Sequence, residues 1–302
     1  MQDILKSAIL NSYPNAKEIV SIQSYRPNYL EYPARVTIRT TDGNLAACTL
    51  KVSEQADILS LEGKVLEALI NLGLSVPKVF AKPSTIQHKS GSHTFLLISE
   101  LSGQPLPWIK LSDLNAAHQT CELVHSAVDT LHSLTPELKS HPIAKLLPSV
   151  TLESELQKIL SIGGKWLENP IIAEALALLR VTVPQFSCPL VFSNGDYNPL
   201  NFLAKKNHIT GWIDFEHACF EDPYIGFAKF LLWADDDYGW GAGVKAGLVE
   251  RYLYKHNVTP LAFLVRLVLR GVSYLQQANP TDAPQYMLNV ITDSVYRLRA
   301  GV

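Results

Sequence analysis

The chain has 302 residues, of which 47% are hydrophobic and 18% are charged, and its formal net charge is −2. This ordinary globular mixture is long enough to bury a large core, in one domain or in two lobes. The small net charge excludes the strongly basic surface typical of proteins that bind nucleic acid or anionic membranes. The sequence has no run of 18 uncharged apolar residues and does not start with a basic segment ahead of an apolar core. We therefore expect neither a membrane span nor a secretory signal.

The cysteines lie far apart in the sequence and form no C-x-x-C pair: Cys48, Cys121, Cys188 and Cys219. This spacing argues against a zinc site and favours small buried thiols in a reducing compartment. On these grounds we expect a cytoplasmic protein.

The first hundred residues predict a sheet accompanied by one main helix. Residues 3–12 carry apolar side chains at helical spacing, and Thr41-Asp42-Gly43-Asn44 is a hairpin signal. Alternating or β-branched runs predict strands at residues 19–24, 35–40, 45–52, 78–82 and 93–98. We expect the first three strands to form an antiparallel meander, and a helix at residues 58–72 to precede the last two.

Lys51, in the third predicted strand, is the first candidate functional residue. Because Leu50 and Val52 flank it, Lys51 points to the opposite face of the sheet from those two side chains. A lysine that alternates with apolar residues is most often exposed to solvent. Here, however, a predicted helix follows with Glu62 in its first turn, and Glu67, nearer the solvent-facing side, is the competing partner.

The rest of the chain is predicted to be mostly helical. Apolar residues at helical spacing predict helices at residues 114–131, 152–163, 170–180, 227–233, 244–254, 261–276 and 283–299. Residues 133–151 are rich in Pro, Ser and Thr and are expected to be a linker. Three histidines recur at intervals of seven on the first of these helices: His118, His125 and His132. Metal-binding histidines commonly stand four residues apart, so we interpret these as structural or as flanking the buried stripe of the helix.

The most informative stretch runs from Leu190 to Tyr224. Its first apolar run ends shortly before Asp196, and Asn201 follows five residues later. A second apolar run, at residues 209–213, ends on Asp214. Two strands that each deliver an acidic or amide side chain at one end suit a divalent cation. The alternative is a β-hairpin whose polar residues only cap the strands.

These residues, in this order, resemble a known family. Asn194-Gly195-Asp196-Tyr197-Asn198-Pro199-Leu200-Asn201 resembles the catalytic loop of the aminoglycoside phosphotransferase and choline kinase-like family, whose members are relatives of the protein kinases. Ile213-Asp214-Phe215-Glu216 resembles that family's metal-binding segment. The resemblance implies that Asp196 is the catalytic base and that Asn201 and Asp214 are ligands of Mg²⁺. Phosphoryl transfer needs such a set, to orient the attacking hydroxyl and to hold the metal against the phosphates.

The resemblance also implies a fold. We expect an α+β, two-lobed protein kinase-like fold, with an N-terminal antiparallel sheet, one main helix and a larger, mainly helical C-terminal lobe. The nucleotide-binding lobe would span residues 1–98 and the hinge residues 99–103. Residues 104–302 would form the second lobe, with the catalytic loop and the acceptor site.

Further binding residues follow from the same resemblance. Lys51, paired with Glu62, would contact the α- and β-phosphates of ATP or GTP, and Val76-Pro77 follows Glu62 at the family's spacing. The Ser99 carbonyl and the Leu101 amide would bind the adenine. That last assignment depends on position in the chain, because an ordinary loop predicts almost the same sequence.

Three departures from the family pattern stand out. Residues 25–33, where kinases carry a glycine-rich loop over the phosphates, contain no glycine. Asn194 replaces a usual His, and Gly226 replaces a buried Asp that supports the catalytic loop. Either the Asn amide satisfies the local backbone groups itself, or the active site is weakened. No phosphate-binding, metal-binding or base residue is lost, which favours a working enzyme.

The sequence gives a weaker indication of the acceptor. An acidic stretch contains Glu216, Glu221, Asp222 and the run Asp235-Asp236-Asp237, and Lys229 is the only Lys or Arg between Trp212 and Gly243. Aromatic residues interleave with it: Trp233, Tyr238 and Trp240. This pattern favours a cationic acceptor such as an aminoglycoside or an amino alcohol. A solvated helix end beside core aromatics explains it equally well, so choline-like acceptors and neutral sugars stay open.

We therefore expect a Mg²⁺-dependent small-molecule kinase that moves the γ-phosphate of ATP or GTP to a hydroxyl group. Its partners would be the nucleotide and a small-molecule acceptor, with no nucleic acid and no membrane. The alternative is a non-catalytic, kinase-like nucleotide-binding module. The joint presence of the base, the metal ligands and the Lys–Glu pair argues for the enzyme, because a binding module has no need of all five residues.

Overall fold

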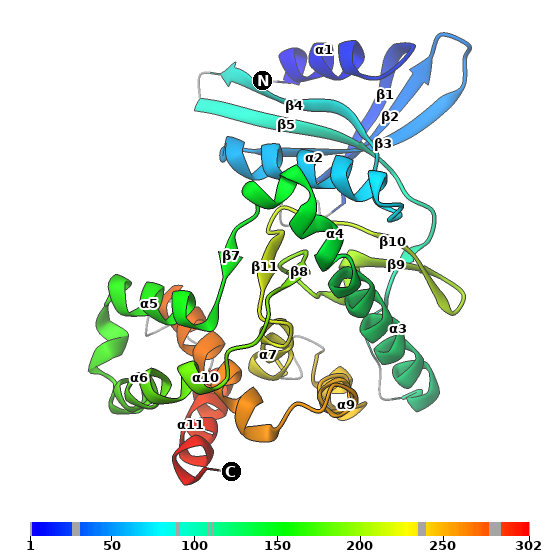
Figure 1. Ribbon diagram of the computed structural model, residues 1–302. Helices are drawn as coiled ribbons and strands as arrows, with labels where there is room; N and C mark the ends of the chain where they lie inside the picture. Colours follow the sequence, from blue (N-terminus) through cyan, green and yellow to red (C-terminus); the bar gives the residue numbers. More distant parts are fainter. Residues whose placement is uncertain are drawn as a thin grey trace. The chain divides into compact units, whose positions relative to one another are not determined.

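The computed structural model describes residues 2–25, 31–88, 91–107, 109, 112–234, 240–277 and 285–301 (Figure 1). The chain divides into two compact units, each built from three segments. Unit 1 comprises residues 1–105, 136–147 and 201–218. Unit 2 comprises residues 106–135, 148–200 and 219–302. No helix among the described residues combines the length and the apolar character that crossing a membrane requires.

The main sheet of unit 1 is antiparallel throughout, in the order β1-β2-β3-β5-β4. Its strands are β1 (Ala16–Ser24), β2 (Ala34–Thr40), β3 (Leu45–Ser53), β4 (Val79–His88) and β5 (Gly91–Ser99). The predicted meander is confirmed as β1-β2-β3, because the turn at Gly43, with φ of +85°, joins β2 to β3. The last two predicted strands are also present, and each extends beyond the predicted residues.

Two helices cover opposite faces of this sheet, α1 (Gln2–Ser12) and α2 (Ala56–Asn71) (Figure 1). On the α1 face, Leu5 and Ile9 pack into a core cluster with Leu50 of β3. On the α2 face, the tight fit leaves no room for a side chain at Gly63, where a Cβ would lie 3.2 Å from Pro83. Because neighbouring side chains of a strand point to opposite faces, the burial of Leu50 against α1 turns Lys51 toward α2.

A second, smaller sheet completes unit 1, with strands in the order β10-β9-β6. These strands are β6 (Gln104–Pro105), β9 (Phe202–Lys205) and β10 (His208–Trp212). The β9–β10 hairpin is the one that the sequence predicts to carry Asn201 and Asp214. It is joined to the preceding part of the unit by the Trp212 amide, which donates a 3.0 Å hydrogen bond to the Ser75 carbonyl.

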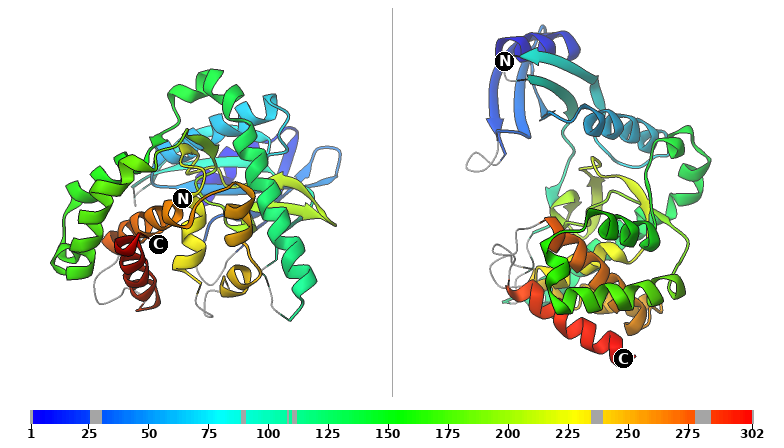
Figure 2. Two further views of the ribbon diagram at one scale, coloured as in Figure 1. Left: turned by 60° about the horizontal axis from the view of Figure 1, so that its bottom comes forward. Right: turned by 90° about the vertical axis from the view of Figure 1, so that its left-hand side faces the viewer.

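Unit 2 is mostly helical. Its α-helices include α3 (Leu114–Ser133), α5 (Leu152–Ile162), α6 (Pro170–Thr182), α7 (Ile225–Leu232), α8 (Gly241–Lys245), α9 (Glu250–Lys255), α10 (Pro260–Gln277) and α11 (Gln285–Ala300). In both views of Figure 2 the green α5 and α6 lie beside the orange and red α10 and α11. Short 3₁₀ turns are η2 (Lys165–Glu168) and η3 (Val183–Gln185). A three-stranded sheet has the order β7 (Ser149–Val150), β11 (Cys219–Glu221) and β8 (Val191–Ser193), and β8 precedes the loop that contains Asp196.

Two predictions about the second half of the chain are wrong. The expected linker at 133–151 is structured, because it contains α4 (Thr135–Ser140), the 3₁₀ turn η1 (Pro142–Lys145) and β7. The single helix expected at 244–254 is two short helices, α8 and α9. They are separated at Gly247, whose φ of +88° is a left-handed conformation that ends a helix.

Candidate functional site

Lys51 is the centre of a charged cluster in unit 1. Its Nζ donates hydrogen bonds to both carboxylate oxygens of Glu62, at 2.9 and 2.8 Å, and to Oδ1 of Asp214 at 2.8 Å. A third carboxylate, Glu216, has its Oε2 at 3.2 Å from the same nitrogen. The sequence predicts the pairing with Glu62. Glu67 on α2 is exposed and does not take that place.

The cluster is largely withdrawn from water. The side chains of Lys51 and Glu62 are 12% and 1% exposed, whereas Asp214 and Glu216 are about one-third exposed. Burial alone would lower the pKa of Lys51, but the carboxylates of Glu62, Asp214 and Glu216 outweigh it and raise that pKa above its ordinary value. The lysine is therefore a permanent cation that three acidic groups fix in position.

The β9–β10 hairpin brings Asn201 and Asp214 to its open end. The ladder pairs Phe202 with Trp212, and the next hydrogen bond joins the Ile213 amide to the Asn201 carbonyl at 3.0 Å. Asp214 then leaves the strand with φ of +66°, a left-handed conformation that side chains rarely adopt. The Phe215 amide donates a 3.2 Å hydrogen bond to Glu62 Oε1, which ties this turn to α2. Asn201 itself is buried.

The donor set at this end of the hairpin suits a hard divalent cation. Three carboxylates face one ammonium group, which leaves two negative charges in excess, and an amide-bearing residue lies beside them. Carboxylate and amide oxygens are the ligands that Mg²⁺ and Ca²⁺ take. No group of three or more His, Cys, Asp or Glu in the described part of the chain holds an ion by itself. A metal here would therefore need the Asn oxygen, water or a ligand oxygen as well.

The segment that the sequence interprets as a hinge is anchored within unit 1. Ser99 ends β5, where its amide donates to the Lys78 carbonyl at 2.8 Å and its hydroxyl accepts from the Lys78 amide at 2.9 Å. Leu101 packs so closely on β10 that a Cβ at Gly211 would lie 2.7 Å from its Cδ1. The hydroxyl group of Thr210, on β10, donates a 2.8 Å hydrogen bond to the carbonyl of Ser102, the residue after Leu101. The adenine-binding role of Ser99 and Leu101 stays a prediction.

Asp196 belongs to unit 2, in a loop that follows β8. Asn194 closes this loop locally, because its Nδ2 donates to the Asp196 carbonyl at 2.9 Å and its Oδ1 accepts from the Asp196 amide at 3.2 Å. Gly195 supplies a left-handed turn with φ of +79°, and its amide donates to the Ser193 hydroxyl at 2.8 Å. The Asn amide therefore satisfies the loop's backbone groups, as one of the two sequence interpretations proposes. The role of Asp196 as a base stays a prediction.

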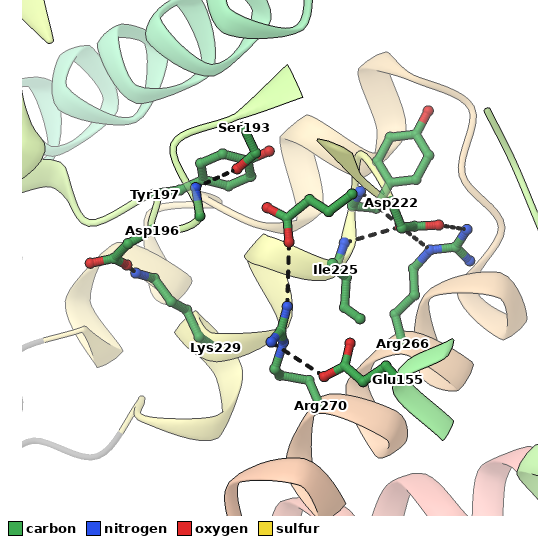
Figure 3. A network of polar contacts seen from close by, with 12 residues as sticks. Glu155, Ser193, Asp196, Tyr197, Asp222, Ile225, Lys229, Arg266 and Arg270 are labelled. Atoms are coloured by element: carbon green, nitrogen blue, oxygen red, sulfur yellow. Dashed lines mark hydrogen bonds and ion pairs between the residues drawn. The ribbon is translucent and has the colours of Figure 1, made fainter. Parts of the chain in front are cut away.

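The carboxylate of Asp196 forms an ion pair with Lys229 of α7 (Figure 3). The Asp196 side chain is 35% exposed, whereas the Lys229 side chain is only 9% exposed. Sequence reasoning missed this pair and noted Lys229 only as an isolated basic residue. A usable signal was present, since Lys229 is the only charged residue in the apolar helix Ile225–Leu232.

Asp222 and Glu221 do not form the acidic face that the sequence suggests. Arg266 binds Asp222 with two hydrogen bonds, of 2.7 Å to Oδ1 and 2.6 Å to Oδ2, and Asp222 also accepts from the Ile225 amide at the start of α7 (Figure 3). Glu221 is buried against Arg270, at 3.5 Å. Both carboxylates are thus buried inside unit 2 and paired with arginines, Arg270 being shared with Glu155, so they do not form an exposed acidic face. The sequence interpretation fails here because it took two buried ion pairs for a solvated surface.

Gly226, one of the positions that depart from the family pattern, packs against Tyr197. A Cβ at Gly226 would lie 2.5 Å from the Tyr197 ring, so the ring occupies the space that a side chain at 226 would need. The ring is fully buried, and its hydroxyl bonds to Nε2 of His132 at 2.8 Å. Burial lowers the pKa of His132 to about 4, so the imidazole is neutral near pH 7. His132 thus packs inside unit 2, and its structural or flanking role stays a prediction.

Some sequence features fall outside the described residues. They are residues 26–30 of the glycine-free loop, the run Asp235-Asp236-Asp237, and Tyr238. Trp233 and Trp240 are described, and each lies against another ring, Tyr274 and Phe230 respectively.

Comparison with known proteins places this geometry in context. Residues 34–262 match the family described as "Phosphotransferase enzyme family". No curated protein matches the chain. A thermostable mutant of aminoglycoside phosphotransferase APH(4)-Ia, in a ternary complex with AMP-PNP and hygromycin B, is 15% identical with a TM-score of 0.68 over 99% of each chain.

Two further solved structures are similar over nearly their whole length. Amicoumacin kinase hAmiN, in complex with AMP-PNP, Ca²⁺ and Ami, is 15% identical with a TM-score of 0.62, over 100% of this chain and 93% of that one. A mutant aminoglycoside 2′-phosphotransferase IIIa in its GDP complex is 16% identical with a TM-score of 0.58, over 100% and 98%. These likenesses confirm the predicted α+β, protein kinase-like fold.

Proposed function

We propose that this chain, which belongs to the phosphotransferase enzyme family, transfers the γ-phosphoryl group of ATP or GTP to a hydroxyl group of a small molecule. Membership of the family confirms the sequence prediction of a phosphotransferase and argues against a module that only binds nucleotide. The similar structures include enzymes solved with AMP-PNP, with GDP and with small-molecule antibiotics. Nucleotide as co-substrate and a small-molecule acceptor follow for this chain by analogy.

The observation that carries the proposal is the Lys51 cluster. A lysine held by Glu62 and Asp214, and kept charged by three carboxylates, provides a fixed cation for the α- and β-phosphates. Its two-point contact with Glu62 prevents the flexible side chain from swinging away. Catalysis of phosphoryl transfer depends chiefly on such positioning and on charge stabilisation.

Asn201 and Asp214 would hold the metal, for which the donor set is suitable. When bound, Mg²⁺ supplies neutralisation of the charge that develops on the phosphate oxygens. Asp196 accepts the proton of the acceptor hydroxyl as that oxygen attacks the γ-phosphorus and the nucleoside diphosphate leaves. The loop built by Asn194 and Gly195 keeps the backbone amide and carbonyl of Asp196 fixed, so that the backbone of the loop does not have to be ordered for each turnover.

The acceptor class is part of the proposal. The similar structures act on, or are bound to, antibiotics, which supports a hydroxylated small molecule. Glu221 and Asp222 give no support for a cationic one, since both are buried and paired with arginines, whereas Glu216 is about one-third exposed and keeps a cationic acceptor open. Aminoglycosides, choline, amino alcohols and neutral sugars therefore all belong in the substrate panel.

The test is release of nucleoside diphosphate from ATP and from GTP, with Mg²⁺, against that panel. Asp196→Asn should lower turnover by about 100-fold or more, the range for loss of a general base, while nucleotide still raises the melting temperature. Asp293→Asn, on the exposed side of α11, is the matched control and should turn over normally. Unchanged turnover in Asp196→Asn would remove the base from the mechanism, and no nucleotide-dependent stabilisation of the parent protein would remove the kinase assignment itself.

A further inference from the structure

Lys229 lies in an unusual place for a lysine. It projects from α7, whose other described residues are apolar, and only 9% of its side chain is exposed. The rings of Phe230 and Trp240 lie within 5.5 and 5.1 Å of its Nζ. The carboxylate that it contacts is that of Asp196 (Figure 3). The helix therefore delivers one buried positive charge to the loop that carries the proposed base.

This charge is not there for stability. Burying an ammonium group costs several kcal/mol even after the protein relaxes, and Arg270 adds a second positive charge to the surroundings. Burial and Arg270 together lower the pKa of Lys229 to about 7, although the adjacent carboxylate favours the charged form. An apolar side chain at this position would fit the helix better. The ion pair is therefore better explained by what it does to Asp196.

A mobile carboxylate is a poor base, because each turnover must then fix its side-chain torsions. The Asn194 side chain holds the backbone of Asp196 through the amide and carbonyl groups. Lys229 acts on the side chain, since an ion pair between a nearly buried ammonium and Oδ1 fixes the carboxylate's direction. The same contact favours the ionised carboxylate over the protonated one, and only the ionised form can accept a proton.

We propose that Lys229 is a positioning residue for the Asp196 base, which it reaches from α7 and holds in one orientation during phosphoryl transfer. The proposal rests on the proposed function, since it requires that Asp196 be the base. In this proposal α7 contributes to catalysis through Lys229, which contacts the Asp196 carboxylate and not the phosphates. Two alternatives make different predictions: a structural lysine affects stability, and a phosphate-binding lysine affects the KM for nucleotide.

The test compares Lys229→Met, Lys229→Gln and Lys229→Arg with Lys245→Met, an exposed lysine on α8 that serves as the control. Turnover is measured as nucleoside diphosphate release with the best acceptor of the panel, or with water as acceptor where none reacts. We expect kcat to fall by about 100-fold in the Met and Gln variants, as for other losses of alignment. The KM for nucleotide should change by less than about threefold, because Lys229 does not contact the nucleotide in this proposal. Lys229→Arg should recover much of kcat.

The melting temperature of the Lys229 variants separates a positioning role of Lys229 from a purely structural one. Because Asp196 is partly exposed, water can hydrate its carboxylate when Lys229 is replaced, so Lys229→Met should unfold at the same temperature as the parent or higher. A lower melting temperature together with a proportionate loss of activity in both uncharged variants would overturn the proposal. So would normal kcat in Lys229→Met while Asp196→Asn is inactive. If Asp196→Asn is itself fully active, the base assignment fails first, and the two failures are thereby told apart.

Discussion

Unit 1 and unit 2 each hold one nearly buried lysine among the candidate functional residues, with side chains 12% and 9% exposed. Lys51 has three carboxylates around it, and its pKa is raised; Lys229 has one carboxylate and a nearby arginine, and its pKa is lowered to about 7. Similar burial thus accompanies opposite pKa shifts, because the neighbouring charges decide the sign. The first lysine is held as a structural cation, whereas the second is retained at a cost in stability.

The largest expected effect follows from removing Lys51. Lys51→Met leaves the carboxylate of Glu62 buried without a counter-charge, so the free energy of unfolding should fall by about 3–5 kcal/mol. Stabilisation by ATP or GTP with Mg²⁺ should be lost as well. Urea denaturation and thermal shift measure the two effects. Lys64→Met is the matched control, because Lys64 is exposed on α2, the helix that carries Glu62. It should change neither the free energy of unfolding nor the stabilisation by nucleotide.

A double variant sharpens this contrast. Lys51→Met combined with Glu62→Leu removes both buried charges and should recover most of the lost stability without recovering nucleotide binding. By comparison, Lys229→Met should need no compensating change. If Lys51→Met proves as stable as the parent protein, then Lys51 does not stabilise unit 1, and the expected difference in stability between the two lysine variants is absent.

The next effect in size concerns Gly226 in unit 2. Gly226→Asp restores the family's residue, but its Cβ would meet the buried Tyr197 ring at 2.5 Å and its carboxylate would have to be buried. The free energy of unfolding should fall by about 3 kcal/mol, from overpacking and an unpaired polar group together. Urea denaturation measures it. In a Tyr197→Ala background, Gly226→Asp should cost much less than it does in the parent, because the clash is relieved; an equally large further loss, measured against the Tyr197→Ala single variant, would show that the ring is not the obstacle.

The two regions also differ in how far the sequence could predict them. Strand alternation placed Lys51 on the opposite face from Leu50, but the choice of Glu62 as its partner came from the resemblance, through the spacing to Val76-Pro77. The β9–β10 hairpin was indicated by the apolar pair after Asn201, a turn, and the apolar run at 209–213 that ends on Asp214. In each case the direction of the candidate side chain depends on its own strand or helix, because only one orientation of that element buries its apolar face.

Unit 2 was harder because its contacts are made between elements that are distant in sequence. Nothing in the residues around Asp196 indicates that Lys229 reaches it, since that depends on how α7 packs beside the loop. The carboxylates of Glu221 and Asp222 looked like surface charges because their partners, Arg270 and Arg266, lie some 45 residues further on. The available signal was Lys229, a charged residue in an otherwise apolar helix. Such a residue indicates that a buried partner exists, but the sequence does not identify which residue it is.

A smaller effect is expected at Asn194, which carries the backbone of the catalytic loop. Asn194→Ala removes two hydrogen bonds and leaves the Asp196 amide and carbonyl without them, which should lower the free energy of unfolding by about 1–2 kcal/mol. Turnover should fall with nucleotide affinity unchanged, because the phosphate-binding residues belong to unit 1. Urea denaturation and the split between kcat and KM check both points. Full activity in this variant would mean that Gly195 and Ser193 are sufficient to shape the loop.

The smallest effect separates the ring of Tyr197 from its hydroxyl group. Tyr197→Phe keeps the ring against Gly226 but removes the 2.8 Å hydrogen bond to His132. The free energy of unfolding should fall by about 1 kcal/mol, the net contribution of one buried hydrogen bond, and kcat should stay within about twofold, since remote packing is preserved. Tyr254→Phe, at a tyrosine that is 85% exposed, is the control and should be neutral. A large loss of kcat in Tyr197→Phe would show that the hydroxyl group, and with it His132, aligns the base alongside Lys229.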